Sequence, residues 1–190
     1  MRPAPISRVA AACALAAALS EAQQVFCAFV FDTEILDALP SRQDRRVHFI
    51  HASLRELDTA LSSRGGGLII RHGRAADEIP ALASELGVGC VFANRDYEPA
   101  AKARDALVAE RLTATGIRFQ TSKDQAIFDG DEVLTQAGKP FSVFTPYKNA
   151  WLKRLTAADC AAWPSGGQLA TTELASLPDL AQIGFTTTDL

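Results

Sequence analysis

The sequence of 190 residues lacks several features that would each have pointed to a function. It has no basic excess, because 19 Lys and Arg stand against 22 Asp and Glu, so the chain alone offers no general attraction for a phosphate backbone. It has no Gly-x-Gly-x-x-Gly or P-loop signature, and Gly65-Gly-Gly67 precedes an apolar run, whereas a phosphate-binding loop follows one. These absences disfavour nucleic-acid binding and a free-standing nucleotide-binding protein.

Closely spaced metal and redox ligands are also lacking. The four cysteines are too far apart in sequence to form a Cys-x-x-Cys pair or a zinc site. Cys27 and Cys90 stand inside apolar runs, so we expect both thiols to be buried in the core, and this cysteine usage favours a cytoplasmic protein. His48 and His51 are three residues apart, but no third ligand has a suitable spacing, which predicts an ordinary helix surface.

No apolar run is long enough to span a membrane as an ordinary helix. Arg2 and Arg8 do precede an apolar stretch, residues 9–19, which gives the outline of a secretory signal. The stretch is mostly Ala rather than Leu and runs on into a predicted strand. We therefore favour a helix that leads back into a sheet, with the signal peptide as the alternative.

What the sequence does contain is an alternation of short apolar runs with segments at helical spacing, which predicts an α/β fold with a parallel sheet. Apolar residues three and four apart predict the helices between the strands, among them Val47, Ile50, Leu54, Leu57 and Leu61. The chain starts with a helix, although a doubly wound sheet normally starts with a strand. The predicted strands are too unbroken to be half-exposed, and they cover residues 25–31, 68–71, 90–93 and 118–121.

The alternation stops after Thr121. A hairpin is predicted around Asp129-Gly-Asp131, and a helix is predicted to begin near Pro146. The tail, residues 159–190, has the composition of a linker.

Three polar residues, Asn94, Asp96 and Glu98, follow the third predicted strand, where open α/β sheets bind ligands. In the alternative interpretation Asn94 and Asp96 only shape the turn, and Glu98 caps the helix that starts near Pro99. Both interpretations can hold together. Arg104 and Asp105 on that helix are interpreted as a surface or packing pair.

Two dense segments carry a resemblance to a known family. One reads Asn94-Arg-Asp-Tyr-Glu-Pro99, and the other includes Lys123-Asp-Gln125 and Thr145-Pro-Tyr-Lys-Asn149 followed by Trp151. Together they resemble the amino-terminal domain of the DNA photolyase and cryptochrome family. The resemblance implies a Rossmann-like parallel sheet with helices on both faces for residues 1–122, and an interdomain linker with a short helix for residues 123–190. The first strand is expected to be missing, because residues 1–12 do not match the family pattern.

In that family the domain can hold an antenna chromophore, which passes light energy to FAD in a helical second domain that binds damaged DNA. The resemblance implies that this flavin domain is missing here, and that FAD and DNA would be bound only through it. Folate-binding members share an Asn-Glu pair where this chain has Ala100 and Ala101, which cannot pair with a pterin, so a deazaflavin, a flavin or no antenna at all is expected instead. The candidate cofactor-binding residues are Asn94, Asp96, Glu98 and Asp32; Asp96 matches a position that contacts deazaflavin in some relatives.

The leading functional hypothesis is the antenna-domain portion of a deoxyribodipyrimidine photo-lyase, in a truncated copy that has no repair activity alone. The alternatives are a cryptochrome-type photoreceptor or binding module, and a free-standing nucleotide-binding α/β protein. No catalytic residue and no metal ligand is expected. A missing central strand would expose the backbone groups of its two neighbours, which predicts poor solubility.

Overall fold

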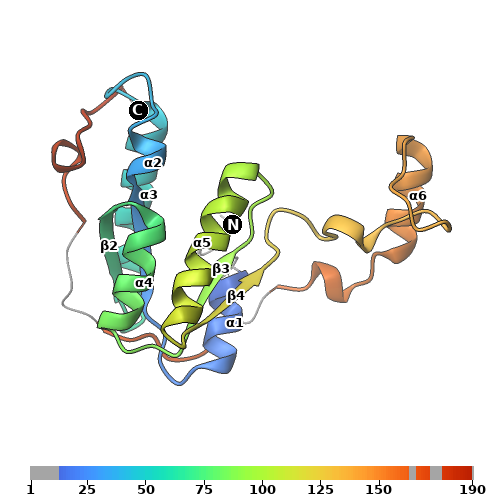
Figure 1. Ribbon diagram of the computed structural model, residues 1–190, viewed down its shortest axis with the longest axis horizontal. Helices are drawn as coiled ribbons and strands as arrows, with labels where there is room; N and C mark the ends of the chain where they lie inside the picture. The colour runs from blue at the N-terminus through green and yellow to red at the C-terminus, as the bar shows by residue number, and fades with distance from the viewer. Residues whose placement is uncertain (1–12, 163–165, 172–176, 190) are drawn as a thin grey trace, which may run out of the picture.

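The computed structural model describes residues 13–162, 166–171 and 177–189 (Figure 1). The proposed signal outline at Arg2 and Arg8 lies outside these ranges. The elements follow in the order α1 (Cys13–Glu21), β1 (Cys27–Asp32), α2 (Thr33–Leu36), α3 (Arg45–Ser62), β2 (Leu68–Gly73), α4 (Ala75–Glu85), β3 (Cys90–Asn94), α5 (Pro99–Ala114), β4 (Arg118–Ser122), the 3-10 helix η2 (Gly130–Glu132), α6 (Phe144–Arg154), and the 3-10 helices η3 (Ala158–Cys160) and η4 (Leu180–Ile183).

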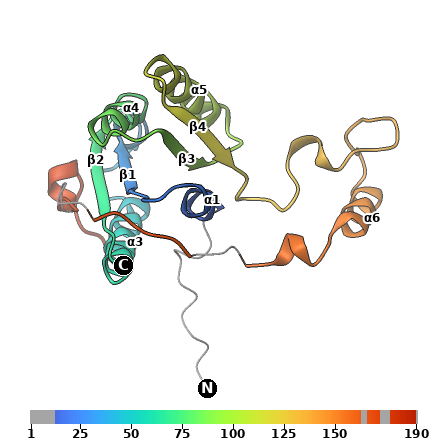
Figure 2. The ribbon, with the colours of Figure 1, turned by 90° about the horizontal axis from the view of Figure 1, so that it is seen from below.

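The α/β fold and the positions of the four strands are confirmed, but the single sheet is not. The strands of the described ranges form two separate parallel pairs. In one pair β1 lies beside β2, with Cys27 opposite Leu68, and in the other β3 lies beside β4, with Cys90 opposite Arg118. Figure 2 shows β1 and β3 as the inner strands of the two pairs. The sheet is therefore divided where a central strand would stand.

Helices cover both faces of this divided sheet. On one face α4 packs against β1, β2 and α5, and α5 packs against β4. On the other face α1 packs against β3 and β4, and α3 packs against β2 (Figure 2). The arrangement is that of a doubly wound domain.

Each strand pair has its own apolar core. The larger core lies around β1 and β2 and includes Val47, Leu54 and Leu61 of α3, while Ile50 of the predicted stripe is 40% exposed. The smaller core lies between β3 and β4 and the helices α4 and α5, and it includes Leu112. Among the described residues no element covers the side of α3 on which Ile50 lies. The buried stripe of α3 is therefore narrower than predicted.

The prediction that the strands are buried on both faces is wrong for the two inner strands, β1 and β3. All five residues of β3 are half-buried, and Ala28 of β1 is exposed. Cys27 and Cys90, predicted as core thiols, are half-buried as well, and partial burial raises the pKa of Cys27 to about 11. The physical reason is the divided sheet, because an inner strand without a second neighbour leaves one edge uncovered.

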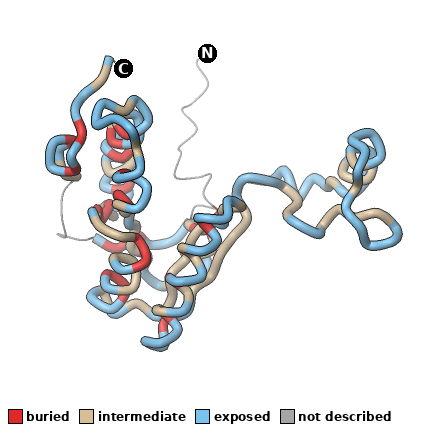
Figure 3. The backbone as a smooth tube through the Cα atoms, turned by 45° about the horizontal axis from the view of Figure 1, so that its top comes forward, coloured by how far each residue is buried: buried red, intermediate tan, exposed pale blue. Residues whose placement is uncertain are grey.

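We call residues 13–122 the body and residues 123–162 the arm. The arm extends away from the body and contains no buried residue (Figures 1 and 3). The helix predicted near Pro146 is present as α6. The hairpin predicted at Asp129-Gly-Asp131 is wrong, because Asp129 and Glu132 cap each other's backbone N–H groups and close η2 instead.

The tail, which has the composition of a linker, packs back on the body. Val25 donates its backbone N–H to Gln168 at 3.1 Å, and Ala170 donates to Val25 at 2.9 Å. Leu169 and Phe185 are buried in the larger core, with exposed fractions of 5% and 1%. The described part of the tail is therefore part of the body's packing.

Among the helices of the described residues, none combines the length and the apolar character that crossing a membrane requires.

Candidate ligand site at the carboxyl edge of the sheet

A cavity of about 790 Å³ lies between the inner strands β1 and β3. Its wall is mostly apolar, with side chains from both strands and from α4 and α5. Polar groups join the wall where the strands end: Asp32 ends β1, Asn94 ends β3, and Arg104 and Asp105 come from α5. An apolar cavity with a few convergent polar groups is the usual form of a ligand site.

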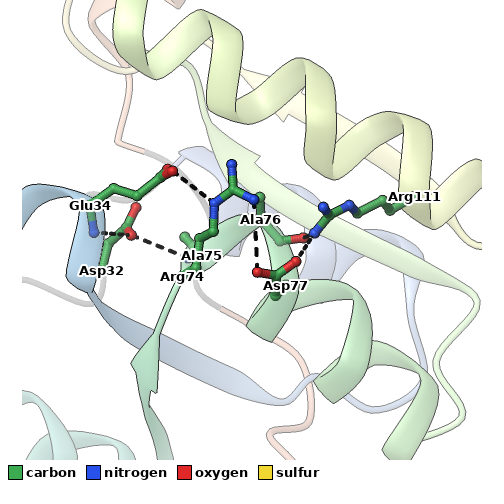
Figure 4. A network of polar contacts seen from close by, with 7 residues as sticks. All are labelled: Asp32, Glu34, Arg74, Ala75, Ala76, Asp77 and Arg111. Carbon is green, nitrogen blue, oxygen red and sulfur yellow. Dashed lines mark hydrogen bonds and ion pairs between the residues drawn. The ribbon is translucent and has the colours of Figure 1, made fainter.

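Asp32 is buried, and its carboxylate binds the starts of two helices. Oδ1 accepts the backbone N–H of Glu34 at 3.1 Å and that of Ala75 at 3.3 Å. The first bond caps α2, and the second joins the end of β1 to the start of α4 (Figure 4). The fold therefore places this carboxylate at the carboxyl edge of the sheet.

A chain of ion pairs extends from this point across the surface (Figure 4). Arg74 binds Glu34 at 2.7 Å and lies 4.0 Å from Asp77, and Asp77 also pairs with Arg111 of α5. Arg111 donates in addition to the carbonyl of Ala76 at 2.7 Å. Because these side chains are well exposed, each pair contributes little to stability, and the chain mainly aligns α2, α4 and α5.

Asn94 connects β3 to the first helix. Its Oδ1 accepts the backbone N–H of Ala14 at 2.9 Å, in the first turn of α1. Among the described residues the amide nitrogen of Asn94 has no hydrogen-bond partner, so its two N–H donors remain available at the cavity.

Asp96 and Glu98 have different roles from Asp32 and Asn94. Oδ1 of Asp96 accepts the backbone N–H groups of Tyr97 at 2.6 Å and Glu98 at 3.1 Å. The N–H of Glu98, followed by that of Tyr97 and by the charge of Arg104, lowers the pKa of Asp96. Asp96 thus shapes its turn as the alternative interpretation suggested, whereas the Glu98 side chain makes no capping hydrogen bond.

The four predicted site residues therefore do not form one cluster. Asp32 and Asn94 line the cavity, and Asp96 and Glu98 do not. Arg104 and Asp105, interpreted from sequence as a surface or packing pair, do line it, with the guanidinium 2.9 and 3.0 Å from the carboxylate. Helical spacing indicates this position. In α5 both residues lie three or four positions from the buried residue before them and from the buried residue after them, so they share that face of the helix.

The histidine pair is structural. Within the described ranges no group of three or more His, Cys, Asp and Glu side chains could hold a metal ion. The prediction of an ordinary helix surface is wrong for His51, which is 5% exposed and whose Nε2 lies 2.7 Å from the carbonyl oxygen of Pro178. His48 contacts the hydroxyl of Thr188 at 2.9 Å. The tail, which is distant in sequence, covers both rings.

Fold and site together define a doubly wound α/β domain with its polar groups at the carboxyl edge. The model of the DNA photolyase family matches residues 7–165, and the chain belongs to this family, which confirms the resemblance. A deoxyribodipyrimidine photo-lyase of Synechococcus sp. is 30% identical over 179 residues, which are 90% of this chain and 37% of the relative. The chain thus spans little more than a third of that relative's length.

Two solved structures share the fold. A bacterial class III photolyase from Agrobacterium tumefaciens has a TM-score of 0.76 at 24% identity, covering 96% of this chain and 37% of its own. An archaeal photolyase from Sulfolobus tokodaii has a TM-score of 0.74 at 23% identity, covering 93% and 39%. The latter structure is described as holding two FAD molecules, with the implication of a novel light-harvesting cofactor.

Proposed function

We propose that the chain is the light-harvesting portion of a deoxyribodipyrimidine photo-lyase and works with a flavin-binding helical domain. Membership of the family supports the class of protein, and the match to 37% of the Synechococcus photo-lyase leaves room for a second domain in the complete enzyme. The chain alone is then expected to split no pyrimidine dimers. FAD and damaged DNA would be bound through the helical domain.

The site proposed for the antenna chromophore is the carboxyl edge of the cavity. The observation that carries this proposal is that Asp32 and Asn94, which end different strands, line the same cavity together with Arg104 and Asp105. The free amide nitrogen of Asn94 supplies a hydrogen-bond donor, and the apolar wall suits a flat ring. Asp96 and Glu98 lie outside the cavity wall and are proposed to act by shaping the adjacent turn.

A deazaflavin or a flavin is the proposed chromophore, in preference to a folate. Ala100 is exposed and Ala101 is buried in α5, and neither side chain has a donor or an acceptor for a pterin ring. The two FAD molecules described for the Sulfolobus tokodaii photolyase show that a member of the family can hold a second flavin.

The arm is the proposed contact with the helical domain. None of the α6 residues is buried, and Val143, Phe144 and Leu152 are 59%, 72% and 53% exposed. Phe144 and Leu152 are eight residues apart and therefore lie on one face of the helix. Exposed apolar side chains grouped in this way are typical of an interaction surface.

Chromophore titration tests the proposed site. The chain is titrated with a deazaflavin, with FAD and with a folate, and binding is followed by ligand fluorescence. We expect saturable binding of the deazaflavin or FAD and none of the folate. We expect Asn94→Leu to weaken binding at least tenfold, and Asn149→Leu, the same change on an exposed residue of α6, to leave it unchanged.

Two results would contradict the proposal: preferential binding of the folate, or equal affinity of the Asn94→Leu and Asn149→Leu variants. Thermal melts of both variants show whether the fold is retained. A cryptochrome-type photoreceptor or binding module stays the alternative prediction, because it shares this domain. Light-driven repair of dimers by the chain joined to a flavin domain would favour the photolyase. Cytoplasmic localisation also stays a prediction.

A further inference from the structure

Residues 186–189 of the tail lie against the start of α3, and we call them the strip. They are exposed or half-buried, whereas Phe185, the residue before them, is 1% exposed in the larger core. Thr186 donates its backbone N–H to the carbonyl of Arg42 at 2.9 Å. The strip is thus held by surface contacts next to a buried anchor, so it can leave α3 while the core stays closed.

Two more contacts of the strip involve side chains at the start of α3. The side-chain amide of Gln43 donates to the carbonyl of Thr187 at 3.3 Å. The guanidinium of Arg45 donates to both carboxylate oxygens of Asp189, at 3.1 and 2.6 Å. An amide and a guanidinium keep their donors in neutral and in mildly acidic solution.

His48 makes a contact of another kind, because its ring nitrogen is an acceptor. Nδ1 accepts the backbone N–H of Thr188 at 3.1 Å and lies 2.9 Å from the Thr188 hydroxyl. A ring nitrogen that accepts carries no proton, so the ring is neutral with its proton on Nε2. The hydroxyl can turn and accept a hydrogen bond, but a backbone N–H can only donate. A proton on Nδ1 therefore breaks the bond to the Thr188 N–H.

The charged groups near His48 belong to α3, to the residue before it and to the strip. Arg45 lies one turn before His48 and pairs with Asp189 at 2.6 Å, and Arg46 pairs with Asp44 at 2.6 Å. Arg45 lowers the pKa of Asp189, and Arg46 lowers that of Asp44 to about 2. Both carboxylates thus keep their charge while a histidine takes up its proton. The ring is the group of this surface that switches between donor and acceptor.

His51, three residues further along α3, responds differently to a proton. Its Nε2 lies 2.7 Å from the carbonyl oxygen of Pro178, and because a carbonyl only accepts, Nε2 carries a proton in both charge states. The other face of the contact is apolar, since the ring stacks on Phe31 with centroids 6.5 Å apart. Asp179, the charged residue beside Pro178, binds the start of η4. Protonation of His51 breaks no bond to the tail.

We propose that the strip is a latch that opens when His48 takes up a proton. With a neutral ring, Nδ1 holds the N–H of Thr188 and the strip lies on α3. With a proton on Nδ1, this N–H loses its acceptor and the ring carries a positive charge one turn from Arg45, so residues 186–189 leave α3 while Phe185 stays buried. Histidine changes its charge between about pH 5 and 8, so the latch closes at the upper end of this range and opens at the lower end. This inference stands on the contacts of the tail and does not depend on the proposed function.

The test follows backbone amide exchange of the full chain by NMR. Each rate is compared with that of an unstructured peptide of the same sequence, which removes the direct effect of pH on exchange. We expect the protection of Thr186 and Thr188 to fall at least tenfold between about pH 8 and 5. The protection of Phe185, whose N–H donates to the carbonyl of Leu180 at 2.8 Å, should change less than twofold.

Three variants assign the effect to one ring nitrogen. His48→Gln keeps a side-chain acceptor that takes up no proton, so the protection of its strip should stay constant within twofold. His72→Gln, the same change at an exposed histidine of β2, is the matched control and should behave like the unmodified chain. Thr188→Val keeps the N–H and removes the hydroxyl that can accept from a protonated Nδ1, so its loss of protection should be at least threefold larger.

The nitrogen chemical shifts of the His48 ring give a second measurement on the unmodified chain. At about pH 8 they should show a bare Nδ1 and a protonated Nε2. A proton on Nδ1 under these conditions would overturn the proposal, as would an unchanged strip in the unmodified chain. A loss of strip protection that persists in His48→Gln would overturn it too, because another group would then be the switch. Equal loss of protection at Phe185 would mean that the whole tail leaves, which also contradicts a latch.

Discussion

The body and the arm differ in where they put their apolar residues. The body, residues 13–122, buries apolar side chains in two cores, whereas the arm, residues 123–162, buries none. Yet the arm holds one of the two motifs that resemble the photolyase family, and its helix α6 exposes Phe144 at 72%. The difference teaches that the body's sequence specifies its own fold, while the arm's sequence specifies a surface.

Small contacts hold the arm together. Phe128 packs edge-on against Trp151 with ring centroids 5.4 Å apart, and the Arg154 guanidinium lies 5.3 Å from the Phe128 ring. Lys123 pairs with Glu132 at 2.7 Å. The aromatic and cation–π contacts contribute about 0.5–1.5 kcal/mol each, the exposed ion pair contributes less, and together they maintain a local structure without a core.

The largest expected difference is in the free energy of unfolding when a phenylalanine is removed from the larger core or from the surface of the arm. Phe185→Ala removes a side chain that is 1% exposed in the larger core, and we expect it to lower the free energy of unfolding by about 3–5 kcal/mol. Phe144→Ala, the same change on the arm, should change it by less than about 0.5 kcal/mol. Urea unfolding followed by circular dichroism measures both. Equal losses would break the comparison.

A smaller effect is expected where the body caps its helices. Asp32→Ala removes the acceptor for the N–H groups of Glu34 and Ala75, and it should cost about 0.5–2 kcal/mol. Asp131→Ala, at an exposed aspartate of the arm, is the control and should have no measurable effect. Urea unfolding followed by circular dichroism measures both variants. A neutral Asp32→Ala would mean that this carboxylate does not hold the carboxyl edge together.

Acid should weaken the body through Asp44, the N-cap of α3. The Arg46 side chain, with help from its backbone N–H at 2.8 Å, lowers the pKa of Asp44 from 3.8 to about 2. A lowered carboxyl pKa stabilises the folded state above the unfolded pKa, and this contribution disappears as the pH falls from about 4 through 2. Asp44→Asn should flatten the fall of unfolding free energy between pH 5 and 2.

Glu132 of the arm sharpens this test. Lys123 and the N–H of Asp129 lower the pKa of Glu132 as well. Because the arm shares no core with the body, Glu132→Gln should leave the pH dependence of the body's unfolding unchanged. A flatter profile for Glu132→Gln would show that the arm and the body unfold together.

The smallest expected effect is that of Phe128→Ala. The substitution removes the partner of Trp151 and should change the tryptophan emission of the arm. It should change the free energy of unfolding of the body by less than about 0.5 kcal/mol. A larger loss would mean that the body depends on the arm.

Local patterns predicted much of the fold. Strand positions and the helix near Pro146 followed from apolar runs and turn residues, and the predicted strands at residues 25–31 and 90–93 end within one residue of the observed ends of β1 and β3. These features depend on residues that are close together in the sequence, and the spacing of apolar residues along the chain therefore predicts them.

Contacts between distant residues were missed. The burial of Phe185 and the tail's cover over His51 depend on contacts with residues far away in the chain, which no local pattern reports. The half-exposure of β3 has the same origin, because the burial of a strand depends on its neighbours across the sheet. The position of Arg104 at the cavity, by contrast, follows from helical spacing along α5.

Native-state amide hydrogen exchange of the whole chain tests the central claim most directly, because it compares the two regions in one sample. We predict slow exchange for buried amides of β2 and of α3 around Leu54, and exchange at least a hundredfold faster for the amides of α6. Protection of α6 equal to that of β2 in the chain alone would contradict the account. It would mean that the arm is already part of the folded core and needs no partner to cover it.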